Sequence, residues 1–215
     1  MLFRSDDGYA LRLSSPRSDA TVDFQNAIDL NGDSREVSRR TVEVADGAAA
    51  IDAVLSGTVT GSSTLVKAGA GTLKVTAAQS YRELRVCAGE LLAADGCFLA
   101  ADAVPVVLKA GATLGGVSGG SNAFGALTLE GDAVLDSGDG SAGLSFADSS
   151  GCDWGGATLT VKGLLQKGKI RFGTDASGLS EAQLARIVVE GDAVARIDEN
   201  GYLVRAPRGT LVSIY

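Results

Sequence analysis

An apolar–charged–apolar triplet recurs along the chain and is its clearest regular pattern. The five copies are Leu11-Arg12-Leu13, Val42-Glu43-Val44, Leu73-Lys74-Val75, Leu84-Arg85-Val86 and Ile170-Arg171-Phe172. A strand places alternate side chains on opposite faces, so each triplet predicts a strand with two residues in a core and one charge in solvent. Such strands build a sheet with one solvated face. That sheet fits either the wall of a solenoid or one layer of a sandwich.

Glycine marks the bends between the expected strands. Thr64–Ala93 consists of short apolar strands separated by glycine turns, with a polar corner at Ala77–Tyr81. Further along, a glycine precedes an apolar strand start at intervals of 14, 18, 13 and 12 residues. These later starts are Gly111–Leu114, Gly125–Leu127, Gly143-Leu144, Gly156–Leu159 and Gly168–Ile170. This loose period is typical of a solenoid whose turns vary in length.

The last forty residues have a different character. Ser180-Glu181-Ala182-Gln183 is a capping box and predicts a helix over about Glu181–Ile187. The sequences Ala193–Asp198 and Tyr202–Arg205 flank Glu199-Asn200-Gly201, a strong hairpin signal. A solenoid needs its last turn covered. We therefore predict one domain, with solenoid repeats in residues 1–173 and a helix-plus-hairpin cap in residues 174–215.

Composition narrows the class of protein. Hydrophobic residues make up 45% of the chain and aromatic residues only 5%, with 29 glycines and 3 prolines. This favours an all-β fold with an aliphatic core over a helical bundle. The net charge of −7 makes nucleic acid a poor partner. The chain has no histidine, so it lacks the commonest general base and transition-metal ligand. We therefore expect no cofactor and no metal, and a protein that is not an enzyme.

One segment resembles a known family. Its pattern residues are Leu65, Lys67, Gly69, Gly71, Thr72, Leu73, Tyr81, Val86, Ala88, Gly89 and Leu91. In this arrangement they resemble the autotransporter-associated β-strand repeat, also called the passenger-associated repeat, of bacterial autotransporters. Most members have Gly-Gly-Thr-Thr after the tyrosine, where this chain has Arg82-Glu83-Leu84-Arg85. The segments Ala20–Gly47, Arg171–Ile187 and Ile197–Val204 are similar to other parts of such passengers, and the resemblance spans about half of the chain.

The resemblance implies a fold and a function. It implies a right-handed parallel β-helix in the C-terminal part of an exported passenger, acting as a non-catalytic structural or adhesin-like module at the bacterial cell surface. Host or matrix glycans or proteins would be its partners. The chain has no run of 18 apolar residues to span a bilayer, and Met1–Asp7 lacks the apolar core of a signal peptide. We therefore expect no membrane insertion by this segment, and further repeats upstream in a longer protein or a reading frame truncated at its start.

An acidic region provides the main alternative function. Asp132, Asp136, Asp139, Asp148 and Asp153 lie among glycines and serines. On a β-helix wall such acids can serve a polysaccharide lyase or hydrolase, or bind calcium. Aspartates also favour turns, where they hydrogen-bond locally. We favour the turn interpretation.

Single residues leave two further questions open. Trp154, the only tryptophan, is a candidate for carbohydrate contact, either on a solenoid or in a carbohydrate-binding β-sandwich, and a packing role is the alternative. Cys87, Cys97 and Cys152 have no zinc-binding spacing. They are either small core residues or, for Cys87 and Cys97, a disulfide between neighbouring strands.

Two motif matches are weak. Asp29-x-Asn31-x-Asp33 resembles the start of a calcium loop but has Ser34 and Arg40 where glycine and glutamate are required, so we predict an Asn-Gly turn. Gly138-x-Gly140-x-x-Gly143 matches the dinucleotide fingerprint by letter, but Leu144-Ser145-Phe146 predicts a strand where the fingerprint needs a helix. We therefore predict a solenoid corner there.

Overall fold

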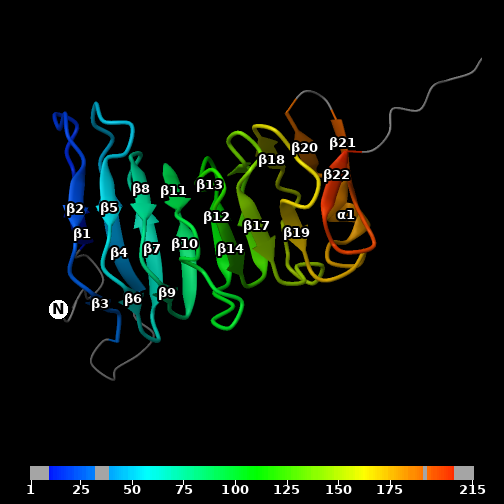
Figure 1. Ribbon diagram of the computed structural model, residues 1–215, viewed down its shortest axis with the longest axis horizontal. Helices are drawn as coiled ribbons and strands as arrows, with labels where there is room; N and C mark the ends of the chain where they lie inside the picture. Colours follow the sequence, from blue (N-terminus) through cyan, green and yellow to red (C-terminus); the bar gives the residue numbers. More distant parts are fainter. Residues whose placement is uncertain (1–9, 32–38, 191–192, 206–215) are drawn as a thin grey trace, which may run out of the picture.

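The chain winds into a coil whose successive turns stack along one axis (Figure 1). The computed structural model describes residues 10–31, 39–190 and 193–205. From β1 to β20, every strand has a parallel partner in an adjacent turn, and only the second of the three walls described below is paired without interruption, from β2 to β20. This confirms the predicted all-β, parallel β-solenoid and excludes the sandwich.

Three walls surround the core. The first wall contains β1 (Ala10–Leu13), β4 (Arg39–Val44), β7 (Thr64–Ala68), β10 (Glu83–Val86), β12 (Val106–Lys109) and β15 (Leu127–Glu130). The second contains β2 (Val22–Phe24), β5 (Ala53–Leu55), β8 (Thr72–Val75), β11 (Glu90–Ala93), β13 (Thr113–Gly116), β16 (Ala133–Asp136), β18 (Leu159–Lys162) and β20 (Ile187–Val189). The third contains β3 (Ile28–Asp29), β6 (Val59–Thr60) and β9 (Gln79–Ser80), and then β14 (Ser121–Phe124), β17 (Gly143–Phe146) and β19 (Ile170–Phe172).

The strand register builds columns of like side chains inside the coil. In the second wall one column consists of Leu73, Leu91, Leu114, Leu135, Val161 and Val189, all fully buried. Burying each of these side chains contributes roughly 2 kcal/mol. The recurring triplets behave as predicted, with the charged residue facing outward between apolar residues, all of them buried except the partly buried Leu11. Aliphatic stacking between turns therefore holds the coil together.

Aromatic residues form a second column inside the third wall, which the sequence analysis did not foresee. The ring centroids of Phe98 and Phe124 are 4.5 Å apart, those of Phe124 and Phe146 5.3 Å, and those of Phe146 and Phe172 5.0 Å. Tyr81 meets Phe98 edge-on at 6.4 Å. Each turn from β9 onward thus places one ring on the ring of the next turn.

The C-terminal elements differ in part from prediction. Helix α1 (Glu181–Leu184) begins with the predicted capping box: Ser180 Oγ accepts from Gln183 N, and Gln183 Oε1 accepts from Ser180 N. The helix ends before Ile187, contrary to prediction, because Ile187–Val189 joins the second wall as β20 beside β18. The hairpin is present as antiparallel β21 (Ala193–Ile197) and β22 (Leu203–Arg205). That these elements cover the coil stays a prediction.

No helix among the described residues is long and apolar enough to cross a membrane.

Candidate functional site

The five aspartates of the acidic region each serve a local turn or a neighbouring corner. Each accepts a backbone N–H, from Thr158 to Asp132, Gly138 to Asp136, Ser141 to Asp139, Ser150 to Asp148 and Gly155 to Asp153. Asp136 also pairs with Lys162 at 3.0 Å. Within the described ranges, no three or more His, Cys, Asp or Glu side chains are grouped so as to hold a metal ion. The geometry favours the turn interpretation.

The pKa shifts of two of these aspartates also favour the turn interpretation. Hydrogen bonds from Ser141 lower the pKa of Asp139, and hydrogen bonds from Ser150 lower the pKa of Asp148. A glycosidase that protonates its leaving group needs a carboxyl whose pKa is raised. These two aspartates are therefore poor general acids.

Trp154 occupies a packing position. Its side chain is 4% exposed, and its ring N–H donates to the carbonyl of Leu127, the first residue of β15, at 3.1 Å. A ring must expose a face to stack on a sugar, and this ring is buried in the hydrophobic core. The packing role is favoured over carbohydrate contact.

All three cysteines are free, so the disulfide considered between Cys87 and Cys97 is absent. Cys97 is buried in the core, its thiol donates to the Val75 carbonyl at 3.3 Å, and burial raises its pKa. It acts as a small core residue, as the first interpretation proposed.

Of the two weak motifs, the first lies only partly within the described residues and the second is a corner. Asp29 Oδ1 accepts from Asn31 N, and Asn31 Oδ1 accepts from the backbone and hydroxyl of Ser62 in the next turn of the coil. Gly32, Asp33 and Ser34 lie outside the described residues, so the Asn-Gly turn stays a prediction. The glycines at 138, 140 and 143 lead directly into strand β17 without a helix. The predicted solenoid corner is confirmed.

Lys67 has a role that sequence reasoning missed. Its side chain is fully buried, and Nζ donates to the carbonyls of Gly69 at 2.6 Å, Gly71 at 2.5 Å and Ala88 at 2.7 Å. Desolvation lowers its pKa from 10.5 to about 8, while the nearby charges of Asp52 and Glu90 act in the opposite direction. The lysine thereby ties the corner after β7 to the corner of the next turn. Lys67 is one of the residues of the repeat pattern, and this was the sequence signal that could have indicated its role.

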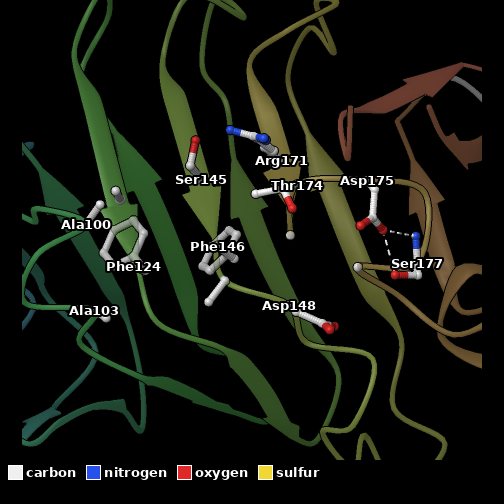
Figure 2. Close-up of a pocket in the computed structure, with 14 residues that line it drawn as sticks. Ala100, Ala103, Phe124, Ser145, Phe146, Asp148, Arg171, Thr174, Asp175 and Ser177 are labelled. Carbon is white, nitrogen blue, oxygen red and sulfur yellow. Dashed lines mark hydrogen bonds between the residues drawn. The ribbon is translucent and has the colours of Figure 1, made fainter. Parts of the chain in front are cut away.

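A pocket opens on the outer side of the third wall (Figure 2). The corner after β14 consists only of residues 125 and 126, whereas longer corners occupy residues 99–105 of an earlier turn and 173–179 of a later one. These two corners and the start of the corner after β17 (residues 147–158) line a cavity of about 460 Å³. Ala100 and Ala103 line it from the first long corner, and Thr174, Asp175, Ser177 and Gly178 from the second.

The pocket combines a small apolar floor with fixed charges. Ala123, Ser145 and Arg171 form one outward row across β14, β17 and β19, and Phe124 and Phe146 also line the cavity. Arg171 is held by a hydrogen bond from Nε to the Asn200 carbonyl at 3.0 Å and by the Tyr202 ring, whose centroid is 5.3 Å from its Cζ.

Two carboxylates complete the pocket, Asp175 in the second long corner and Asp148 in the corner after β17. Asp175 Oδ1 accepts from the backbone and hydroxyl of Ser177, and Asp148 is held by Ser150 in the same way. These bonds lower the pKa of both aspartates, which are therefore ionised at neutral pH. The sequence analysis singled out Asp148 but not Asp175.

In comparisons with known proteins, no protein family, no curated protein and no solved structure matches this chain.

Proposed function

We propose that this chain is a non-catalytic structural module of an exported, autotransporter-type bacterial surface protein, in which the coil acts as a rigid spacer. The observation that carries the proposal is the unbroken parallel pairing of the second wall from β2 to β20, with β1 and β22 at opposite ends of the coil (Figure 1). A rod of this kind can hold a distal region away from the cell.

Stiffness follows from how the turns are joined. An interior strand donates and accepts hydrogen bonds on both sides, and the leucine column adds a continuous apolar contact along the axis. Bending the rod would open both the hydrogen-bond ladder and the column, and each exposed leucine would cost roughly 2 kcal/mol.

The residues that carry the family resemblance also support the proposal. Lys67, Gly69, Gly71 and Ala88 form one connected corner. Gly89 belongs to it as well, because an added Cβ would lie 2.5 Å from Lys67 Nζ. The pattern thus describes a physical unit that links two turns, as expected of a repeat that propagates a coil.

Display on a laboratory Gram-negative host tests export and folding together. The full chain, with an N-terminal epitope tag, would replace the passenger of an autotransporter. We expect intact cells to bind the antibody and trypsin to leave a resistant fragment. The control Leu91→Asp places a charge in the leucine column and should yield no such fragment. A wild-type chain that is absent from the surface, or degraded as fast as the control, would contradict the proposal.

The enzyme alternative is tested separately. The purified chain would be incubated with uronate-rich polysaccharides, with and without calcium, and the release of reducing or unsaturated ends measured. We expect none. Release that disappears in Asp136→Asn or Asp148→Asn would replace the spacer function by catalysis.

A further inference from the structure

We infer that the pocket on the third wall binds an extended peptide segment with a basic side chain, whose cationic group lies at Asp148 and Asp175. This inference rests on the pocket alone and does not depend on export or on the spacer function.

The two carboxylates are held in place and retain free binding capacity. In both, Oδ1 accepts two hydrogen bonds from an Asp-x-Ser turn, and no protein group in the described part of the chain donates to Oδ2. The two corners are joined by a hydrogen bond from Ser149 N to the Gly178 carbonyl at 3.0 Å, and Figure 2 shows Asp148 and Asp175 at the same end of the pocket. Two fixed carboxylates with unused oxygens are a favourable site for an ammonium or guanidinium group.

The net charge of the pocket lining indicates that the ligand is positively charged. Two aspartates against one arginine give the pocket lining a charge of −1, and the whole chain carries −7. An acidic ligand would be repelled by both. Arg171 uses Nε for the Asn200 carbonyl, and its remaining N–H groups can donate to a neutral acceptor such as a peptide carbonyl.

The apolar end of the pocket favours a peptide over a sugar as the ligand. The faces of Phe124 and Phe146 are used in the aromatic column, where their centroids are 5.3 Å apart, so no ring face is available to stack on a sugar. The alanines at 100, 103 and 123 instead form a shallow surface for a small aliphatic side chain. The row from β14 to β19 covers two strand spacings, roughly 10 Å, which is the length of about three residues of extended peptide.

Titration of the ¹⁵N-labelled full chain tests the inference. The probes are acetyl-Ala-Val-Lys-Ala-amide, the same peptide with Glu in place of Lys, and maltotriose. We expect saturable shifts in the amide signals of Ser145, Ala147 and Thr174 with the lysine peptide only. Raising the salt concentration from about 20 to about 200 mM should weaken this binding about threefold.

Matched variants locate the cationic group. Asp148→Asn and Asp175→Asn keep an oxygen that accepts from the serine of the turn, so the fold should be retained while each variant weakens binding about threefold. Asp139→Asn alters the same kind of Asp-x-Ser turn outside the pocket lining and should leave the affinity unchanged. The inference is overturned by unchanged affinity in the Asp148→Asn/Asp175→Asn double variant, by equal binding of the glutamate peptide, by saturation with maltotriose, or by no saturable shift with the lysine peptide.

Discussion

Lys67 shows how a charged residue takes a core position. Strand register places it in the column between Val42 and Val86, both buried aliphatic residues. Its methylene stem fills the space of an aliphatic side chain, and its amino group reaches three carbonyls at the corner. The general rule that charges face solvent fails here, because within the described part of the chain the carbonyls of Gly69 and Ala88 accept no backbone hydrogen bond and that of Gly71 accepts only a long one, from Glu90 N at 3.4 Å.

We expect Lys67→Met to destabilise the protein by about 2 kcal/mol. Methionine preserves the apolar stem but leaves the carbonyls of Gly69 and Ala88 without a donor and that of Gly71 with only the Glu90 N–H, and this loss outweighs the relief of a buried charge. Urea unfolding followed by circular dichroism measures the effect. Lys74→Met, which changes a partly exposed outward lysine on the next strand, should alter the free energy of unfolding by less than about 0.5 kcal/mol. A Lys67→Met variant as stable as the wild type would contradict this account.

The lowered pKa of Lys67 predicts a pH dependence with a definite sign. The folded protein releases this proton near pH 8, whereas the unfolded chain keeps it to about 10.5. Between these values the unfolded state binds more protons, so the free energy of unfolding rises with pH, by at most about 3 kcal/mol, and this gain is lost as pH falls through 8. The unfolding free energy of the wild type minus that of Lys67→Met, measured from pH 7 to 10.5, isolates this group. A difference that is flat or that falls with pH would refute the shift.

At the scale of the element, the corners determine how closely the turns can stack. Gly69 and Gly111 have nearly the same positive φ, +79° and +77°. An added Cβ at Gly69 would lie 2.2 Å from the Val44 carbonyl oxygen of the preceding turn, whereas at Gly111 it would meet nothing within 4 Å. The two positions share the conformational strain and differ in the clash.

We therefore expect Gly69→Ala to cost about 3 kcal/mol or more and Gly111→Ala about 1 kcal/mol, the cost of the positive φ alone. Thermal and urea unfolding of both variants would separate the two contributions. Equal losses would show that the turns can move apart at Gly69 without penalty.

The elements also show where sequence reasoning stops. The capping box at Ser180 identified the start of α1 correctly, because the cap depends on residues three apart. The end of α1 was wrong because Ile187 responds to a partner distant in sequence, Leu159 of β18. Trp154 was ambiguous for the same reason, since its partner Leu127 is known only once the turns are in register.

At the scale of the whole molecule, the alternating triplets and glycine bends predicted the coil. Which residues of successive turns pair could not be predicted, because the corners vary in length. Phenylalanines at 98, 124, 146 and 172 recur at steps of 22 or 26 residues. These steps indicate the length of one turn, which the irregular glycine intervals did not reveal. The pocket could not be predicted, because it is formed by corners some seventy residues apart in the sequence. Its charges were visible individually, but their proximity is a consequence of the stacking.

In a stack of turns, truncating a core side chain should lower the free energy of unfolding more in the middle of the coil than at an end, because an interior side chain has neighbours in two adjacent turns. Leu91 lies between Leu73 and Leu114 and is fully buried, whereas Leu13, in the first described turn, pairs with Val44 on one side and is 6% exposed. We expect Leu91→Ala to cost about 3 kcal/mol and Leu13→Ala about half as much. Urea unfolding gives both values. Amide hydrogen exchange should show that Leu91→Ala reduces protection in β8, β11 and β13 together, while Leu13→Ala affects β1 and β4 alone. Equal costs, or a local effect confined to β11, would mean that the turns are stabilised individually rather than by their neighbours.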